Sequence, residues 1–393
     1  MTFEKLEDIA LVTPGTSPKG DLINSSGLGL PFFQGSKEFN ELYPVPERYT
    51  EHPVKVANSG DVLISVRAPV GKVNIAREDC SIGRGVMSVR AKKKSEQMFI
   101  FYFLKNLQGK WDSLGSTGSV FENLSTVALN NVDLPSGLKR EEIGEILFNI
   151  DKKIECNNVL SKTLESMAQA IFKSWFIDFD PVKAKMAGEK PAGMDAATAA
   201  LFPDSMEESE LGLIPSGWEL KKVEEVLKRI TVKGLPKSTV LLNLGRTLVL
   251  EQGDSVIAGF IDEDADVEAT NDSPAFVFGD HTCRMRLSTM PISIFPNTIV
   301  LSSELINTYW AFGATWGLQK FETYRRHWME LAYKVLIVPN TEVANVYGEQ
   351  VKPMFEIIDA LMVQNRVLSA LRDDLLPRLI SGELQIPDEM LAS

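Results

Sequence analysis

The sequence is poor in cysteine and histidine, with only three of each among 393 residues. Cys80, Cys156 and Cys283 lie far apart and form no CxxC pair. A disulfide framework or a zinc site needs numerous or closely spaced cysteines, so we expect neither, and we expect no bound metal. The pattern favours a reducing, cytoplasmic setting.

Long apolar runs and targeting signals are also missing. No run of about eighteen apolar residues is present, so the sequence predicts no membrane span. The N-terminus, MTFEKLEDIA, lacks the basic segment and the apolar core of a secretory signal.

Catalytic and nucleotide-binding motifs are absent from the sequence. It has no GxxxxGK(S/T), no GxSxG, no HExxH, no GxGxxG between a strand and a helix, and no Asn/Asp-Pro-Pro-aromatic motif. We therefore expect no catalysis by this chain and interpret it as a recognition or scaffold protein.

Positive charge is in deficit, with 41 Lys and Arg against 53 Asp and Glu and a net charge of −12. This balance excludes a general nucleic-acid coat. It leaves room for a local basic surface, because binding follows the local field rather than the total charge.

Two segments far apart in the chain carry the same heptad pattern. NNVLS begins at Asn157 and NRVLS begins at Asn365, and apolar residues recur around both at steps of three and four. Asn at one seam position of each segment predicts that the two helices pack on each other in a fixed register. Leu164 breaks the repeat, because it meets Arg372. The alternative is a chance similarity of two core helices. The seam residues that we expect to pair are Ile150, Ile154, Asn157, Leu164, Ile171, Ile358, Met362, Asn365, Leu376 and Leu379.

The repeat extends beyond the helices. VALNNVDLPSG and LAYKVLIVPNT precede them, GSTGSVF resembles GATWGLQKF further upstream, and KLEDIA near the start resembles KVEEVL. The whole unit is therefore doubled. We predict a globular domain at 1–139, a helix at 140–178, a linker at 179–216, a second globular domain at 217–342, a helix at 343–386 and a tail at 387–393. Pro377 should kink or shorten the second helix.

The first globular domain holds a basic field and polar loops. GDVLISVRAPVGKVNIAR predicts short strands and tight turns, with no acidic residue between Val62 and Arg77. Arg and Lys suit phosphates and guanine, and Gln suits adenine. The alternative is a set of solvated turns. Our candidate DNA contacts here are Ser17, Lys19, Gln34, Arg67, Lys72 and Arg84.

The second globular domain gathers its basic residues in VFGDHTCRMRL and FETYRRHWM. Asp280 beside His281 is weak support for a catalytic pair, and we favour a structural or base-contacting role. Our candidate DNA contacts here are Asp280, His281, Thr282, Arg284, Tyr324 and Arg325.

The chain resembles the specificity (S, HsdS) subunits of type I restriction-modification enzymes over nearly its whole length. The resemblance rests on GDVLISVRAPVGKV (60–73) with GRGV (83–86), FKSWFIDFDPV (172–182), FGDHT (278–282) and NRVLSALRDDLLPRLISGEL (365–384), in this order. The second domain lacks the GDVLISVRAPVGKV run and looks like a different recognition subtype.

The resemblance implies an α+β fold with an internal pseudo-two-fold repeat. Each globular domain would be a target recognition domain for one half of a split double-stranded DNA target, and the helices would form an antiparallel coiled-coil spacer. It implies two methyltransferase (M) subunits that methylate adenine and, optionally, restriction (R) subunits. S-adenosylmethionine would bind the M subunits, ATP and Mg the R subunits, and no cofactor this chain. The alternatives are a duplicated coiled-coil adaptor that reads no DNA and a fused methyltransferase.

Overall fold

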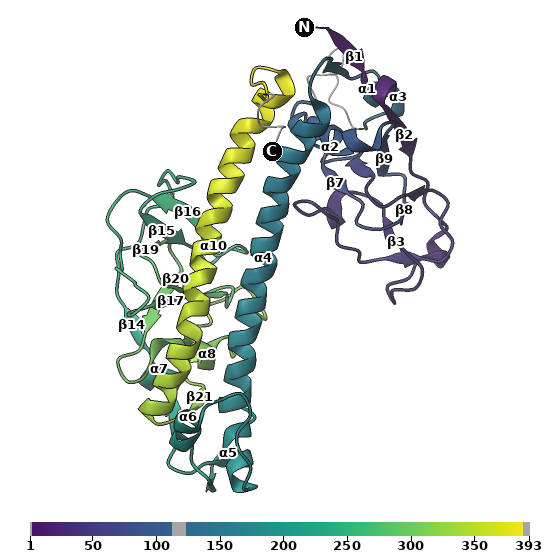
Figure 1. Ribbon diagram of the computed structural model, residues 1–393. Helices are drawn as coiled ribbons and strands as arrows, with labels where there is room; N and C mark the ends of the chain where they lie inside the picture. Colours follow the sequence, from purple (N-terminus) through teal and green to yellow (C-terminus); the bar gives the residue numbers. More distant parts are fainter. Residues whose placement is uncertain (1, 112–122, 388–393) are drawn as a thin grey trace. The chain divides into compact units, whose positions relative to one another are not determined.

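The computed structural model describes residues 2–111 and 123–387, which form two units with separate cores (Figure 1). The first unit contains the chain up to Ile154 and again from Leu368, and the second is Glu155–Val367. Each unit takes part of both long helices, α4 (Arg140–Phe176) and α10 (Thr341–Ser381). The domain boundaries predicted from the sequence, which keep each helix whole, stay a prediction.

Two small sheets form the body of the first unit. One has the strand order β2-β9-β6-β7 with antiparallel pairs throughout. The other has the order β4-β3-β8-β5, and its β3–β8 pair is parallel. The strands are short, and β6, β7 and β8 are completely buried, as expected for strands inside a core. Their bounds are β2 (Ala10–Pro14), β3 (Leu30–Phe33), β4 (Tyr49–Thr50), β5 (Val56–Ala57), β6 (Val62–Ser65), β7 (Val73–Ile75), β8 (Cys80–Ile82) and β9 (Val86–Ala91).

Helices and a two-stranded ribbon complete the first unit. The apolar run of α2 (Gln97–Asn106) is buried and packs on this core. Gly144 of α4 allows close approach, because a Cβ there would lie 2.5 Å from the backbone nitrogen of Phe99. The other elements are β1 (Phe3–Lys5), α1 (Leu6–Ile9), η1 (Gly20–Leu22), η2 (Ser36–Glu38), η3 (Lys94–Glu96), α3 (Thr126–Asn130) and β10 (Asp133–Pro135), with β1 antiparallel to β10.

The second unit repeats this topology. Its sheets have the orders β14-β20-β17-β18 and β16-β15-β19, and the β15–β19 pair is again parallel. In chain order each strand of these two sheets has a counterpart in the sheets of the first unit. In the sheets of the first unit, β5 has no counterpart in the second unit. The ribbon also recurs, as β13 antiparallel to β21, and is followed by a short helix with the same capping box. The bounds are β13 (Glu219–Lys222), α7 (Val223–Val226), β14 (Lys228–Ile230), β15 (Thr247–Leu250), β16 (Ile257–Ile261), β17 (Ala275–Gly279), β18 (Met285–Ser288), β19 (Ile292–Ile294), β20 (Thr298–Ser302), α8 (Thr308–Thr315), α9 (Trp328–Ala332) and β21 (Val335–Val338).

The segment predicted as a linker differs from the expectation of irregular chain. It forms α5 (Asp180–Met186), α6 (Ala196–Leu201) and a hairpin of β11 (Met206–Ser209) and β12 (Gly212–Pro215). Phe179, Val182 and Phe202 are buried in the core of the second unit. The sequence did not predict these contacts, because the segment has no regular spacing of apolar residues. Single apolar residues between turns attach it to the core.

The long helices run antiparallel within the second unit, where Ala168 and Asn157 of α4 contact Tyr347 and Asn365 of α10. Pro377 does not shorten α10, which continues to Ser381 and ends at Gly382 with a φ of 73°. Residues 115–121, used in the repeat comparison, and 388–393 of the predicted tail lie outside the described residues. Within the described ranges, no helix is long and apolar enough to cross a membrane.

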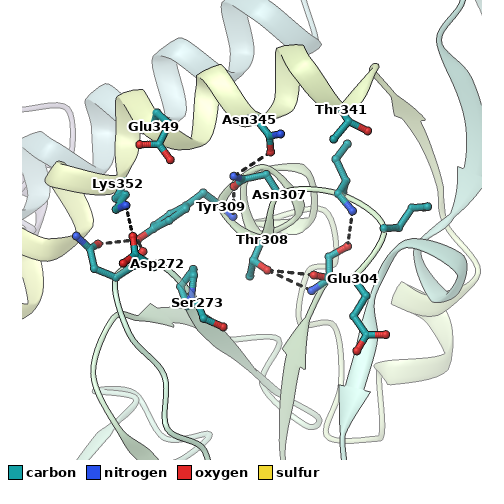
Figure 2. Close-up of a pocket in the computed structure, with 15 residues that line it drawn as sticks. Asp272, Ser273, Glu304, Asn307, Thr308, Tyr309, Thr341, Asn345, Glu349 and Lys352 are labelled. Atoms are coloured by element: carbon teal, nitrogen blue, oxygen red, sulfur yellow. Dashed lines mark hydrogen bonds and ion pairs between the residues drawn. The ribbon is translucent and has the colours of Figure 1, made fainter.

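Polar contacts fasten the second sheet domain to α10 (Figure 2). Asn307 caps α8 by accepting from the backbone nitrogen of Tyr309 at 2.9 Å, and its amide lies 3.4 Å from the side-chain oxygen of Asn345. Lys352 forms an ion pair with Asp272. These contacts line a polar hollow and explain it as an attachment between the domain and the helix.

Candidate nucleic-acid interface

Three loops of the first unit meet at one end of its sheets. The backbone nitrogen of Thr16 donates to the Ile82 carbonyl at 2.9 Å, and that of Gly83 donates to the Phe33 carbonyl at 2.8 Å. Ser17 joins the first loop to the third, because its hydroxyl oxygen accepts from the Arg84 nitrogen at 3.2 Å. A Cβ at Gly85 would lie 2.1 Å from the Gln34 carbonyl oxygen, so only glycine allows this approach. Four of our six candidates, Ser17, Lys19, Gln34 and Arg84, therefore belong to one loop cluster.

The β6–β7 hairpin brings the other two candidates to the same cluster. The Val66 nitrogen donates to the Gly85 carbonyl at 3.0 Å, which places exposed Arg67 next to the third loop. The Ser65 hydroxyl donates to the Pro69 carbonyl at 2.7 Å and accepts from the Lys72 nitrogen at 2.9 Å. These bonds fix the hairpin on which Arg67 and Lys72 lie.

The cations of this cluster are available to a ligand. Across residues 2–111 and 123–387, the side chains of Lys19, Arg67, Lys72 and Arg84 form no ion pair. Exposed, uncompensated Arg and Lys on loops are suited to phosphate and guanine contacts. Gln34 is held in place instead, because Arg48 donates to its amide oxygen at 3.1 Å and stacks on Phe32.

The ladder registers superimpose the paired strands of the two hairpins, whereas the loops differ in length, with six residues between Ser65 and Lys72 and four between Gly279 and Arg284. Ser65 pairs with Val86 as Gly279 pairs with Thr298, and Ile64 pairs with Val73 as Phe278 pairs with Met285. The hydrogen bonds repeat as well. The Ser65 nitrogen donates to the Lys72 carbonyl, and that of Gly279 to the Arg284 carbonyl, both at 2.8 Å.

Arg67 and His281 are therefore each the second residue after the first strand of the hairpin, and Lys72 and Arg284 each directly precede the second strand. Arg67 and Lys72 in the first domain, and Asp280, His281, Thr282 and Arg284 in the second, were chosen without this register and fall on the same hairpin of the same fold. Arg284 is exposed and pairs with Asp254, which is fully exposed. His281 is half-buried, and its ring lies edge-on to that of Tyr324 with centroids 4.7 Å apart.

Asp280 and Thr282 have structural contacts. The Asp280 carboxylate accepts from the backbone nitrogens of His327 and Trp328 at 3.2 and 3.0 Å and so caps α9. Among the described residues, Nδ1 of His281 has no hydrogen-bond partner, so it does not pair with Asp280. The Thr282 hydroxyl donates to the Gln252 carbonyl at 2.7 Å. DNA contact by Asp280 and Thr282 stays a prediction.

Tyr324 and Arg325 lie on the loop before α9. Tyr324 is 75% exposed. The Arg325 guanidinium lies 2.9 Å from Glu330 and 3.3 Å from Glu322, so it is partly neutralised. Tyr324 therefore remains a candidate for base contact, whereas Arg325 first stabilises its own loop.

Sequence reasoning missed Lys237. The Leu235 nitrogen donates to the Ile294 carbonyl as that of Thr16 donates to Ile82, so the loop after β14 is the counterpart of the loop after β2. Pro236-Lys237 follows in this loop as Pro18-Lys19 does in the first. The signal was the shared Pro-Lys after the KLEDIA-like segment, and Lys237 is exposed and without an ion pair in the described chain.

The seam residues of the long helices fall into three groups. Asn157 is 1% exposed, and its amide donates to Gln364 at 2.7 Å and to Asn365 at 2.8 Å. Arg372, which breaks the repeat, forms an ion pair with Asp151 at 2.5 Å within the first unit.

The apolar seam residues pack on different cores. In the second unit Ile358 is buried in one core, with Leu164 and Ile171 against it, whereas Met362 packs on the other core of the sheet domain. Leu376 and Leu379 are buried in the first unit, where Ile150 and Ile154 are only half-buried.

Comparisons with known proteins agree with this architecture. Residues 1–166 match the family described as type I restriction modification DNA specificity domain. Over these residues the chain is similar to this family.

Three individual proteins show how much of the chain is similar to known proteins. A type I restriction enzyme specificity subunit (MjaIX) of Methanocaldococcus jannaschii is 25% identical over 98% of this chain and 94% of its own. A putative specificity subunit (MjaX) of the same organism is 38% identical, over 40% of this chain and only 37% of its own length. The crystal structure of a type I restriction-modification S subunit from M. genitalium covers 96% of both chains with a TM-score of 0.59. At 15% identity this last likeness concerns the fold alone, and it confirms the predicted α+β class.

Proposed function

We propose that this chain gives a type I restriction-modification complex its DNA sequence specificity and is not itself catalytic. The observation that carries the proposal is the equivalence of the two loop clusters. Two domains of one topology present different residues at the same hairpin positions, Arg67 and Lys72 in one and His281 and Arg284 in the other. Such a chain reads two different short sequences with one scaffold.

The partners follow from the same proposal. Double-stranded DNA binds the loop clusters, and two methyltransferase subunits bind the chain, with restriction subunits as an optional addition. Leu160 and Met167 of α4 are exposed apolar residues seven positions apart, hence on one face of the helix. An apolar face of this kind suits a protein partner, and we assign it to the methyltransferase subunits. We place the complex in the cytoplasm, with its DNA.

The division of labour assigns the cofactors to those partners. S-adenosylmethionine serves the methyltransferase subunits, and ATP and Mg serve the restriction subunits. This chain positions the adenine-methylating subunits by binding both halves of the target. The paired helices act as the spacer between the two recognition domains.

Genome-wide mapping of adenine methylation tests the proposal. Cells that express the chain with its neighbouring methyltransferase subunit are compared with cells that lack only this chain. We expect a split motif that appears only with the chain. If the methyltransferase is active and no motif depends on the chain, the proposal is wrong, and an adaptor that joins proteins without reading DNA replaces it.

A further inference from the structure

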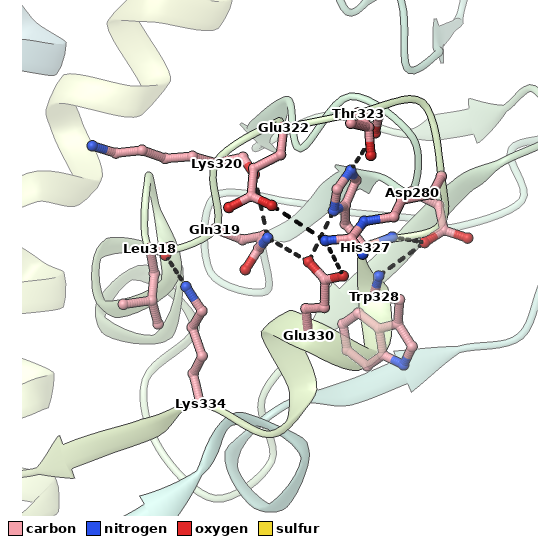
Figure 3. Close-up of polar contacts among 11 residues, drawn as sticks. Asp280, Leu318, Gln319, Lys320, Glu322, Thr323, His327, Trp328, Glu330 and Lys334 are labelled. Carbon is pink, nitrogen blue, oxygen red and sulfur yellow. Dashed lines mark hydrogen bonds and ion pairs between the residues drawn. The ribbon is translucent and has the colours of Figure 1, made fainter.

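His327 is completely buried at the start of α9, in a position unusual for a side chain that ionises near neutral pH. It lies between the loop that carries Tyr324 and the β17–β18 hairpin that carries His281 (Figure 3). None of the roles assigned above uses this ring.

Both ring nitrogens of His327 face acceptors. Nε2 lies 2.9 Å from the carbonyl oxygen of Thr323, which can only accept. Nδ1 lies 3.0 Å from Oε2 of Glu330. Two acceptors at hydrogen-bond distance require a hydrogen on each nitrogen, which is the imidazolium form of the ring.

The surroundings favour an ionised Glu330 as the acceptor. Gln319 donates to the same Oε2 at 2.8 Å, and the Arg325 guanidinium lies 2.9 Å from Oε1. The hydrogen bond from His327, aided by Arg325 and opposed by desolvation, lowers the pKa of the Glu330 carboxyl. A carboxylate that receives three donors holds no proton of its own to offer the ring.

The other charged and titratable groups around His327 belong to its loop and to the hairpin. Glu322 of the loop pairs with Arg325, and Arg326 lies 3.7 Å from the Asp280 carboxylate, which holds the His327 backbone nitrogen. On the hairpin, burial raises the pKa of the Cys283 thiol to about 11, with Glu330 and Asp280 adding to the rise, so this thiol is neutral. Lys334 donates to the Leu318 carbonyl (Figure 3), and the Arg325 and Arg326 guanidiniums are both paired with carboxylates.

We propose that His327, as an imidazolium ion, is a positioning residue for the second half of the DNA target. Through Thr323 it fixes the backbone next to Tyr324, and through Glu330 it fixes the Arg325 guanidinium. Tyr324 is thereby held against His281, which is the counterpart of Arg67. The inference rests on the proposed function, because it concerns how that site is formed.

Loss of the proton changes the network in a defined way. A neutral ring has one hydrogen, so either the Thr323 carbonyl or Glu330 loses its bond. The loop is then released on one side, and the reading of the second half-site weakens as pH rises. The first half-site is unaffected, because the network lies within the second unit, and His52, the histidine of the first unit, is exposed.

The test uses the complete complex with its methyltransferase subunits and a randomised DNA library. Methylation preference is measured separately for each half of the motif between about pH 6 and pH 9, for wild type, His327→Gln, Glu330→Gln and the control His52→Gln. We expect the wild-type preference at the second half-site to fall with rising pH. His327→Gln should relax that half at least tenfold at every pH, and the first half and the control should match wild type. A His327→Gln complex with wild-type preference and pH profile overturns the proposal.

Two further measurements keep the outcome clear. Glu330→Gln retains an acceptor for His327 but removes the charge, so the fall in preference should move to lower pH even if His327→Gln fails to fold. An unchanged profile argues against the proposal. In the full chain labelled with ¹⁵N-histidine, the His327 ring should show two protonated nitrogens at neutral pH, and a neutral ring overturns the inference independently of any DNA. Absence of a chain-dependent motif in wild type, with an imidazolium His327, identifies failure of the proposed function instead.

Discussion

Asp151 and Asp359 lie 208 residues apart, at equivalent positions of the two long helices, and each binds the rest of its own unit. This is the separation that also joins Asn157 to Asn365. Asp151 accepts from Tyr102 at 2.7 Å and from Arg372 at 2.5 Å. Asp359 accepts from Arg286 at 2.6 Å and from the Thr289 nitrogen at 2.7 Å. Both copies of the repeat therefore have an aspartate that attaches the long helix to its own unit, although the residues that donate to the two aspartates differ.

We expect Asp151→Asn to destabilise the first unit by about 1–3 kcal/mol, because Tyr102 and Arg372 lose a buried charged acceptor and Arg372 keeps only the exposed Asp373. Hydrogen exchange of the β6 and β9 amides measures this local loss. Asp264→Asn is the matched control, since Asp264 is 93% exposed in its ion pair with Arg246 and should contribute less than about 1 kcal/mol. Equal effects of the two changes would contradict the anchor role.

The buried amide of Asn157 gives a second prediction. Asn157→Leu removes the donor to exposed Gln364 and half-buried Asn365, and we expect a loss of about 1 kcal/mol. The double change Asn157→Leu with Asn365→Leu should recover most of this loss, because two apolar groups replace a buried polar pair. A double-mutant cycle from denaturant unfolding measures the coupling, and additive losses would show that the pair does not act together.

Arg67→Ala should weaken methylation at the first half-site by about five- to 150-fold, the range for one lost base contact of 1–3 kcal/mol. Methylation-motif sequencing should show relaxation in that half alone. Lys94→Ala is the control, because Lys94 is exposed beyond the opposite end of β9 from the Arg84 loop. If all sequences are bound as by wild type, Arg67 is not a contact.

The lowered pKa of Glu330 predicts an acid-sensitive contribution to the second unit. A carboxyl with a lowered folded-state pKa stabilises the fold fully above its ordinary value of 4.5, and this contribution disappears as pH falls through the lowered pKa. Thermal unfolding of wild type and Glu330→Gln should therefore differ most above about pH 5 and converge on further acidification. A difference that grows as pH falls would have the wrong sign.

Matched heptad insertions test the spacer. Seven residues added to α4 and to the facing part of α10 lengthen each helix by about 10 Å, which corresponds to about three base pairs. The unread gap of the motif should lengthen by that amount while both half-sites stay the same. An insertion in α4 alone is the control and should disrupt the pairing. A constant gap with matched insertions would exclude the spacer role.

The helices, the repeat and most loops at the interface could be predicted from the sequence, because heptads and strand patterns are local signals. The roles of individual polar residues could not. Asp280 and His281 are neighbours in sequence, but one caps α9 and the other faces Tyr324, and only the position of α9 decides this. Arg372 interrupts the apolar repeat of the sequence. The structure explains this position by its ion pair with Asp151, which lies far away in the chain. Lys237 was overlooked because the Pro-Lys pair that it shares with Lys19 is too short a signal by itself, and the equivalence of the two loops depends on strand pairing.

The shared ladder register of the two hairpins also affects how such a protein can change. Arg67, Lys72, His281 and Arg284 lie on the loops of hairpins whose strands are held by backbone pairing and buried side chains. Exchanges at exposed positions, such as those of Arg67 and Arg284, usually alter stability by less than about 0.5 kcal/mol. A few substitutions in one half can therefore produce a new target, and the successive variants stay folded. Diversity of recognition is then limited by DNA chemistry and not by the folding of the chain.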